Sequence, residues 1–308
     1  MSRALHALLI LLLGGCSREE RLITLGGRTM GTTWTLRVDA DAQSTRQTDL
    51  QQKLDTWEAI LSHWRPDSAL SRFNSSTSTD WMAVPAELIE VVELAQQISH
   101  DCDHALDITI APLVDLWGFG AKGKRASSPT AAKIAAAKAR CGWQHLQTRH
   151  DPPALRKTIP HLQLNVSAVA EGWALDKIAK HLESIGIANF LLEIGGEVLA
   201  RGEWRVGVQR PGAPPGEAAQ TLQLKDQSIA TSGVYRQNFT AEGKQRSHIL
   251  DPRTGRPIEH DLASVSVIHS SATQADGYAT ALLVLGPGKG RELAEKLGLR
   301  VVWFERGK

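Results

Sequence analysis

The chain has 308 residues, of which 42% are hydrophobic, and its formal net charge is +2 at pH 7. This length allows one large domain or two small ones, and the apolar content is enough for a full core, which excludes general disorder. A charge so close to zero gives no basic surface of the kind that nucleic-acid binding requires, so we expect no nucleic-acid partner.

Residues 1–15 have the pattern of a secretory signal peptide. Arg3 precedes an apolar run over residues 4–13, which is too short to cross a bilayer as a helix. The Leu-Gly-Gly-Cys segment that ends at Cys16 resembles the lipobox of bacterial lipoproteins. It predicts cleavage before Cys16, lipid on its sulfur and a lipidated tether over residues 16–22; the alternative is an ordinary signal peptide with a chance cysteine. We therefore expect a chain anchored by lipid to the periplasmic side of a cell membrane, inner or outer.

Two further cysteines, Cys102 and Cys141, would lie in an oxidising compartment, where thiols can pair. The sequence leaves both possibilities open, a disulfide or two separate thiols. Neither cysteine has a second one at CxxC spacing, which argues against a zinc site.

Hydrophobic periodicity predicts the elements of the first half in chain order. Residues 33–38 alternate like a half-buried strand, and helical spacing of apolar residues follows at 45–64 and 86–99. Ser128 and Pro129 have the residue types of an N-cap and a first turn, so they predict the start of a third helix.

The second half is predicted to contain more strands than the first. Pro and Gly mark residues 210–217 as a surface loop. Strands are predicted at 162–164, 190–194, 204–208, 221–224, 264–269 and 301–304, and helices at 172–185, 274–285 and 289–297. Strands and helices that mix without strict alternation predict an α+β fold in a single domain, which we place at residues 23–308.

A glycine pattern at residues 118–123 matches GxGxxG but lacks the surroundings of a dinucleotide site. Such a site needs a strand before the glycines, a helix opening on them and an acidic residue about twenty positions later. Here Pro112 and Trp117 precede the glycines, and Arg140 stands where the acidic residue would be. A phosphate-binding P-loop is also excluded, because Arg125 replaces the Ser or Thr that would hold magnesium.

Asp276 and Thr280 are the sharpest candidates for chemistry. They are four residues apart in a predicted helix, so their side chains share one face. A carboxylate and a hydroxyl are hard oxygen ligands that suit Mg²⁺. Taken singly, each also has a structural alternative, as a first-turn Asp and a Thr bonded to its own backbone. His248, in a strongly patterned segment, is likewise either a catalyst or an ordinary surface or packed residue.

Several further motifs occur in a fixed order along the chain, and together they resemble the ApbE family of flavin transferases. The resemblance extends from Met30 to the last strand and rests on MGT at 30–32, SxWxxxSxLSRFN at 62–74, DITxxPLVxLWGFG at 107–120, EGxxxD at 171–176, EIGGE at 193–197, TSGxY at 231–235, SHxxDPRTGxP at 247–257 and ADxxAT at 275–280. It implies the family's α+β, T-fold-like domain.

The resemblance also implies an activity, Mg²⁺-dependent transfer of FMN from FAD to a Thr of an acceptor flavoprotein, with release of AMP. The acceptor would be a subunit of a membrane redox complex or another periplasmic flavoprotein. The site residues implied are Met30 and Trp64 beside the flavin, Asp107, Ile108, Thr109, Asn165 and Glu171 at the nucleotide, His248 near the reacting pyrophosphate, and the Asp276 and Thr280 side chains with the Ala168 carbonyl at Mg²⁺.

Two positions depart from the usual family pattern. Many members carry Lys where Glu171 stands, although some enterobacterial members have Glu. Trp64 occupies a position where an aromatic residue, often Tyr, favours transfer and Asn favours hydrolysis. The resemblance therefore favours a transferase; the alternatives are an FAD pyrophosphatase, which releases FMN and AMP, and a lipoprotein that only binds FAD. Either His248 or a nearby carboxylate would accept the proton of the attacking hydroxyl.

Overall fold

The computed structural model describes residues 22–39, 46–120, 123, 127–213, 217–234, 238–241 and 244–306, with the backbone alone at 238–241 and 244–246. The predicted signal peptide, the predicted lipidation site Cys16 and residues 17–21 of the predicted tether lie outside the described residues. Leu22, the last residue of that tether, begins the first strand. Within the described parts, no helix is long and apolar enough to cross a membrane.

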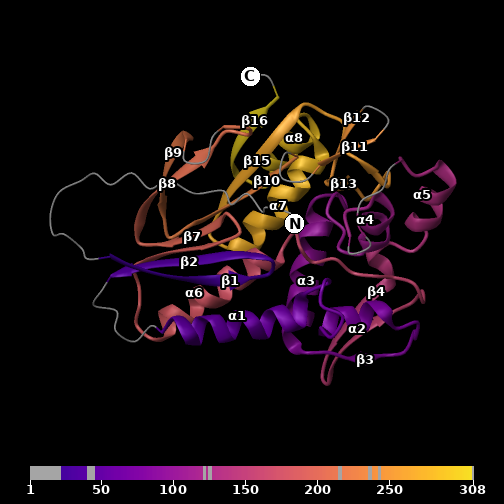
Figure 1. Cartoon of the computed structure of the whole chain (residues 1–308), viewed down its shortest axis with the longest axis horizontal. Helices are drawn as coiled ribbons and strands as arrows, with labels where there is room; N and C mark the ends of the chain where they lie inside the picture. The colour runs from indigo at the N-terminus through magenta and orange to yellow at the C-terminus, as the bar shows by residue number, and fades with distance from the viewer. Residues whose placement is uncertain are drawn as a thin grey trace.

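Helices and strands mix along the chain, as the α+β expectation requires (Figure 1). The helices are α1 (Gln47–Leu61), α2 (Ala69–Ser75), α3 (Ala86–Asp101), α4 (Ala111–Trp117), α5 (Ala131–Lys138), α6 (Ala170–Ser184), α7 (Ala272–Leu285) and α8 (Lys289–Lys296), with a 3₁₀ turn at Trp143–His145. The strands are β1 (Leu22–Thr29), β2 (Thr32–Asp39), β3 (Met82–Ala83), β4 (Leu146–His150), β5 (Pro153–Lys157), β6 (Phe190–Ile194), β7 (Glu197–Arg201), β8 (Glu203–Gln209), β9 (Ala218–Lys225), β10 (Ser228–Gly233), β11 (Asn238–Ala241), β12 (Lys244–Ser247), β13 (Leu250–Asp251), β14 (Arg256–Pro257), β15 (Leu262–His269) and β16 (Arg300–Glu305).

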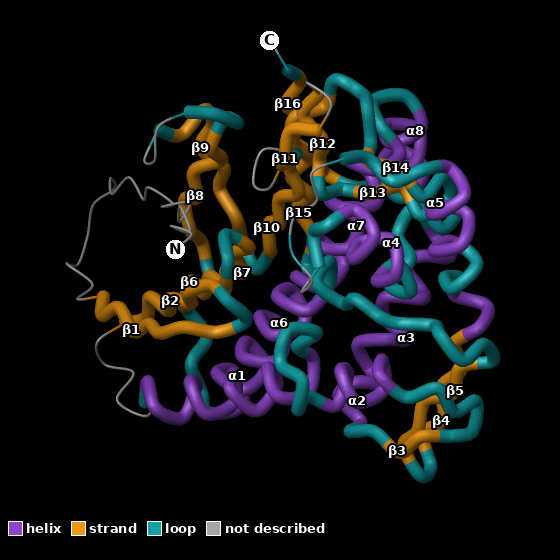
Figure 2. Tube along the Cα trace, turned by 45° about the vertical axis from the view of Figure 1, so that its right-hand side comes forward, coloured by secondary structure: helices purple, strands orange, loops and turns teal. Residues whose placement is uncertain are grey.

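A seven-stranded antiparallel sheet organises the molecule, with the strand order β1-β2-β6-β7-β10-β15-β16. Side chains alternate between the two faces of the sheet along each strand, and each face packs against a hydrophobic core. In β6, Phe190, Leu192 and Ile194 join the main core, whereas Leu191 points to a second, smaller one. Helices α6 and α7 cover the first face and the β8–β9 hairpin covers the second (Figure 2).

Most predicted elements are present, and two details were wrong. The helix predicted to open at Ser128 is α5, whose N-cap is Thr130, since the Thr130 side chain accepts the Lys133 N–H. Residues 162–164 are not a strand; Gln163 forms only an isolated parallel bridge with Ile110. The backbone groups of Leu162 and Leu164, on either side of Gln163, form hydrogen bonds with side chains.

Cys102 and Cys141 are both free thiols, so the structure decides between the two possibilities that the sequence left open. Burial raises the pKa of Cys102 to about 11 and that of Cys141 to about 12. Both groups are therefore neutral thiols at physiological pH and unreactive as nucleophiles.

Candidate functional site

A cavity of about 220 Å³ opens where the loop before α4, the start of α6, β10 and α7 meet. Eight of the predicted site residues line it: Asp107, Ile108, Asn165, Ala168, Glu171, His248, Asp276 and Thr280. The volume is below the roughly 300–1,000 Å³ typical of sites that enclose a whole ligand, so a larger ligand would extend beyond this cavity. Three predicted residues, Met30, Trp64 and Thr109, are not among its lining residues.

Two short segments run in parallel at one wall of the cavity, although they are far apart in sequence. The Asn165 N–H donates to the Ile108 carbonyl at 2.7 Å, and Ile110 forms its bridge with Gln163. The Asn165 side chain accepts the Ser167 N–H at 3.0 Å, which turns the chain toward α6. This pairing brings Asp107, Ile108 and Asn165 to the same part of the cavity lining.

The second of these segments is held by side chains instead of a neighbouring strand. Asn74, the last residue of the SxWxxxSxLSRFN motif, accepts the Leu164 N–H at 2.7 Å and donates to the Leu164 carbonyl at 2.8 Å. The buried Lys157 ammonium donates to the carbonyls of Leu162 and Phe73. Burial lowers the pKa of Lys157 to about 8. These contacts explain why residues 162–164 need no ladder partner on this side.

Asp107 is a buried carboxylate with a firmly fixed orientation. Its Oδ1 accepts the backbone N–H and the hydroxyl of Thr109, at 2.8 and 2.7 Å, and its Oδ2 accepts the Trp143 N–H at 3.2 Å. Burial raises the pKa of Asp107, while the Thr109 hydrogen bonds oppose this shift. Thr109 is itself fully buried and also accepts the Gly142 N–H. In this structure Thr109 supports Asp107 from behind the cavity wall.

Another part of the cavity lining comes from α6 and α7, which pack against each other. Asp276, which is only 6% exposed, accepts the Gly172 N–H of α6 at 3.3 Å through its Oδ2. One turn later on α7, the Thr280 hydroxyl is hydrogen-bonded to the Ser232 hydroxyl of β10 at 2.8 Å. Ala168 lies in the loop that enters α6. The Asp276–Thr280 pair therefore faces the cavity on one side of α7, as the four-residue spacing predicted.

Sequence reasoning did not assign Glu197 and Ser232, which also line the cavity. Glu197 follows the tight turn of β6 and β7, in which Gly195 and Gly196 both have positive φ angles. An added Cβ on Gly195 would lie 2.6 Å from the Glu171 carboxylate, so this glycine gives Glu171 its space. Glu197 belongs to the EIGGE motif and Ser232 to the TSGxY motif, and these motifs are the sequence features that could have identified the two residues.

The described lining residues make the cavity strongly acidic. Four carboxylates face it, from Asp107, Glu171, Glu197 and Asp276, and His248 is the only lining residue in the described part of the chain with an ionisable nitrogen. Carboxylates repel an anionic phosphate, so a phosphate would bind here together with a cation.

The oxygen donors of this cavity fit a hard divalent ion. The Asp276 carboxylate, the Thr280 hydroxyl and the backbone near Ala168 are of the type that Mg²⁺ prefers, and Mg²⁺ is commonly bound by one or two carboxylates together with substrate phosphates. A cluster of three or more His, Cys, Asp or Glu side chains suited to a metal is absent from the described residues. Any such site would thus depend on mixed oxygen ligands.

His248 is placed by contacts between two of the motifs. The Trp117 indole of α4 donates to the carbonyl of Gly255, which belongs to the DPRTG turn after β13. Asp251 closes that turn by accepting the Gly255 N–H on its carbonyl and by pairing with the Arg253 guanidinium.

The glycines at 118–123 follow α4, not a strand, since Gly118 ends this helix with a φ of 82°. The Phe119 ring next to it meets the His248 ring edge-on, with centroids 6.2 Å apart.

Met30 occupies the two-residue turn between β1 and β2. Met30 and Gly31 have φ angles of 48° and 77°, the pair of positive values that a type I′ hairpin turn requires. A positive φ angle is uncommon for methionine, so Met30 is a residue whose backbone conformation requires an explanation. The Met30 N–H donates to the Glu58 carboxylate of α1 at 2.9 Å, and its side chain packs against the main core.

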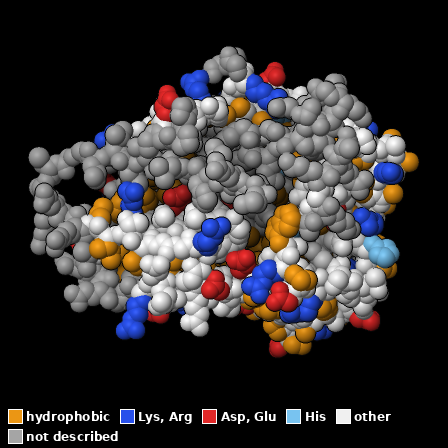
Figure 3. Space-filling model, in the orientation of Figure 1, with side chains coloured by type: hydrophobic (Ala, Val, Ile, Leu, Met, Phe, Trp, Pro, Cys, Tyr) orange, Lys and Arg blue, Asp and Glu red, His pale blue; other side chains and the backbone are white. Residues whose placement is uncertain are grey.

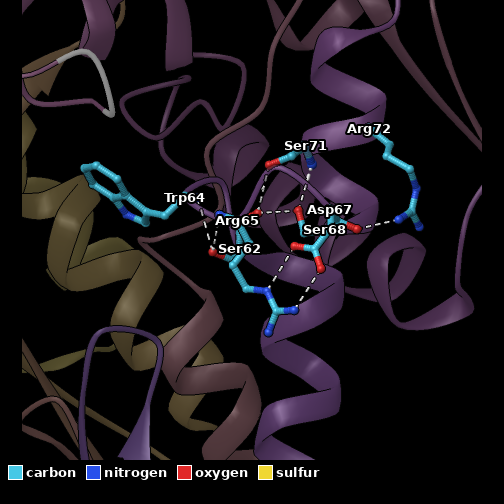
Figure 4. Close-up of polar contacts among 7 residues, drawn as sticks. All are labelled: Ser62, Trp64, Arg65, Asp67, Ser68, Ser71 and Arg72. Atoms are coloured by element: carbon cyan, nitrogen blue, oxygen red, sulfur yellow. Dashed lines mark hydrogen bonds and ion pairs between the residues drawn. The ribbon is translucent and has the colours of Figure 1, made fainter.

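Trp64 extends from a loop that is held by serine hydroxyls (Figure 4). The Ser62 hydroxyl accepts the Trp64 N–H, and the Ser62 carbonyl accepts hydroxyls from Ser68 and Ser71 at 2.5 and 3.2 Å. Figure 4 shows the indole pointing away from this polar cluster, and the Trp64 side chain is 58% exposed. The serines of the motif thus fix a loop that presents a large aromatic side chain to solvent.

On the face drawn in Figure 3, Lys and Arg side chains alternate with Asp and Glu side chains among the described residues. Among the described residues that line the cavity, by contrast, the acidic side chains outnumber the basic ones.

Comparison with known proteins gives matches that cover most of the chain. The model of the ApbE family matches residues 30–303. The FAD:protein FMN transferase of Salmonella typhimurium is 41% identical over 308 aligned positions, which span 94% of this chain and 88% of that protein. The FAD:protein FMN transferase of Escherichia coli K12 is 38% identical, and the alignment spans 92% of this chain and 84% of that protein.

Solved structures show the same fold. The apo form of the Pseudomonas stutzeri flavinyl transferase ApbE superposes with a TM-score of 0.84 at 36% identity, over 94% of this chain and 92% of that one. The Vibrio cholerae flavin transferase ApbE gives a TM-score of 0.81 at 36% identity, over 94% of both chains. The expected single ApbE domain is therefore confirmed, and the chain belongs to the ApbE family.

Proposed function

We propose that this chain is an FAD:protein FMN transferase that uses Mg²⁺ and attaches FMN to a Thr hydroxyl of an acceptor flavoprotein. The observation that carries the proposal is the convergence of the Asp276 carboxylate, the Thr280 hydroxyl and the Ala168 segment on one acidic cavity, which Asp107, Asn165 and Glu171 also line. The names of the similar proteins from Salmonella and Escherichia support the reaction class.

In the proposed reaction, the acceptor hydroxyl oxygen forms a bond to the phosphorus of the FMN half. The bond from that phosphorus to the bridging oxygen breaks, AMP leaves with this oxygen, and the hydroxyl proton is lost. Asp107 and Asn165 would hold the nucleotide, and His248 or one of the neighbouring carboxylates would accept the proton. Asp276, Thr280 and the Ala168 carbonyl would hold Mg²⁺, which when bound neutralises charge on the pyrophosphate.

The protein's own contribution is mainly positioning. The hydrogen bonds that fix Asp107 and Asp276 hold the two carboxylates before any ligand arrives, so little reorganisation is required on binding. The acidic lining makes binding of the FAD pyrophosphate depend on a divalent ion. We accordingly expect strict dependence of turnover on Mg²⁺.

A direct test mixes the purified chain with FAD, Mg²⁺ and an acceptor domain that contains a candidate Thr, followed by in-gel flavin fluorescence after denaturation. We expect a fluorescent acceptor band that is lost with EDTA and in Asp276→Asn. The matched control is Glu203→Gln, which changes an exposed carboxylate paired with Lys225 on the β8–β9 hairpin. Full labelling by Asp276→Asn would contradict the metal assignment. Free FMN and AMP without a band would instead indicate a pyrophosphatase, and tight FAD binding without turnover a carrier.

For location, we propose a lipid anchor on Cys16 at the periplasmic side of a membrane, supported by the apolar leader and the Leu-Gly-Gly-Cys segment. Stable anchoring needs more than one acyl chain, as lipoproteins provide. Cys16→Ser should move the protein from the membrane fraction to the soluble fraction and abolish incorporation of labelled palmitate. Unchanged membrane association in this variant would contradict the anchor.

A further inference from the structure

Asp176, which belongs to the EGxxxD motif, accepts four hydrogen bonds from the first residues of α7. Its Oδ1 accepts the Ala272 N–H at 2.8 Å, and its Oδ2 accepts the Thr273 N–H at 2.9 Å. Oδ2 also accepts the hydroxyls of Thr273 and Ser271, at 2.6 and 2.7 Å. A single carboxylate of α6 thus binds the N-cap and the first two residues of another helix, about 95 positions later in the chain.

These bonds go beyond what capping of α7 requires. The helix has a cap of its own, because the Ser271 hydroxyl accepts the Gln274 N–H. A cap from the helix's own chain satisfies its N–H groups but leaves its position relative to other elements open. Since the Asp176 carboxylate comes from α6, it fixes where the first turn of α7 lies along that helix. Its negative charge at a helix N-terminus adds a favourable interaction with the helix dipole.

Gly172 provides a second point of attachment on the same face of α6, four residues before Asp176. A Cβ on Gly172 would lie 2.4 Å from the Ala272 carbonyl oxygen, so the two helices touch through their backbones here. The Gly172 N–H also donates to Asp276 Oδ2. Asp176 and Gly172 therefore hold α7 at its first turn and at the turn that carries Asp276.

We propose that Asp176 is a positioning residue that sets the depth and rotation of α7 in the cavity, and so the placement of the Asp276 and Thr280 oxygens. The inference rests on the proposed function, in which these oxygens hold the divalent ion. Asp276 and Thr280 lie one and two turns beyond Ala272, so any slide or rotation of the first turn of α7 is passed on to both ligands. Small displacements matter, because Mg²⁺ requires near-ideal octahedral geometry.

The test measures binding of Mn²⁺, a spectroscopic substitute for Mg²⁺, by its EPR signal in the full chain, with unfolding followed in parallel. We expect Asp176→Asn, which keeps the shape but leaves one acceptor oxygen, to remain folded and to bind Mn²⁺ at least about tenfold more weakly, as is common for residues that support metal ligands. Asp176→Glu, with two oxygens on a longer stem, should recover part of the affinity. Thr130→Ala, which removes the N-cap of the peripheral helix α5, is the control that lowers stability without changing Mn²⁺ affinity.

Two outcomes separate this inference from the function on which it rests. If Asp276→Asn binds Mn²⁺ as tightly as the unchanged chain, the proposed metal site is wrong and the role of Asp176 falls with it. If Asp276→Asn loses binding while folded Asp176→Asn keeps it, the metal site stands and the inference is overturned. Should Asp176→Asn not fold, Thr273→Val removes one of the four bonds; a smaller loss of affinity then supports the inference, and none overturns it.

Discussion

The Trp117 indole donates a hydrogen bond of 2.8 Å to the carbonyl of Gly255, although the two residues are 138 positions apart. Both lie in motifs that sequence reasoning associates with the substrate, but their contact with each other is structural. It fastens the DPRTG turn to α4, and this turn closes the segment that carries His248. The Gly255 backbone fits tightly, since a Cβ there would lie 2.9 Å from Ile134.

Trp117→Phe should therefore lower the free energy of unfolding by about 1–3 kcal/mol, because it leaves the buried Gly255 carbonyl without its donor. Denaturant unfolding measures the change. Trp81→Phe is the matched control, as Trp81 is exposed and lies against Arg149, and it should cost much less. Equal losses in the two variants would show that the Trp117 hydrogen bond contributes nothing specific.

Gly172→Ala should destabilise the protein by about 1–3 kcal/mol despite the better helix propensity of alanine, because the new methyl group would press on the Ala272 carbonyl. The same variant should lower FMN transfer, since α7 would move away from α6. Gly288→Ala serves as the control: its Cβ would meet nothing within 4 Å and its φ is −80°. Thermal unfolding and the labelling assay report the two effects, and an unaffected Gly172→Ala would refute the close contact.

Thr109→Val should cost about 1–3 kcal/mol of stability, because the Asp107 carboxylate and the Gly142 N–H each lose a buried partner. It should also raise the pKa of Asp107 further, since the Thr109 hydrogen bond opposes the effect of burial. Thr109→Ser retains the hydroxyl and should behave nearly like the unchanged chain. Urea unfolding and NMR titration of the Asp107 carboxyl provide the measurements; a Thr109→Ser variant as damaged as Thr109→Val would rule out the hydroxyl as the cause.

His260 should make the fold less stable in acid. Its Nε2–H donates to the Leu283 carbonyl at 2.7 Å and its Nδ1 accepts the Leu262 N–H, so the neutral ring fits the structure. Burial lowers the pKa of His260 below its ordinary value of 6.5, which outweighs the opposing effect of the hydrogen bond to Leu283. The unfolded chain then binds the proton more readily, and the stabilisation is complete above about pH 6.5 and lost as the pH falls through the folded-state pKa.

The check is urea unfolding of the unchanged chain and of His260→Gln at about pH 7.5 and about pH 5.5. The unchanged chain should lose more stability between the two values than the variant does. His63 and His181 also have lowered pKa values and titrate in both proteins, so only the difference between the two slopes reports on His260. Identical slopes would exclude it as a contributor.

Local sequence patterns were sufficient to predict the long helices and the placement of a carboxylate and a hydroxyl on one face of α7. Apolar spacing placed α1, α3 and α6 within a few residues, because each buries one stripe against the core, and α7 was placed by its largely apolar sequence, since it is buried on most sides. The four-residue spacing put Asp276 and Thr280 on one face of a helix that forms as predicted. By contrast, β1, which contains Gly26 and Gly27, and the short strands β3, β4 and β5 escaped prediction, since few of their residues alternate in polarity.

Tertiary structure alone decided which residues share a site and which support it. The bonds of Asn74 to Leu164, of Gly142 to Thr109 and of Asp176 to the start of α7 join positions whose neighbours in sequence give no sign of the partner. The sequence likewise gives no sign that Thr109 lies outside the cavity lining. A motif records that a residue type is needed at a position. Whether the side chain faces a ligand or holds another side chain depends on packing between distant segments, which is a property of the folded chain.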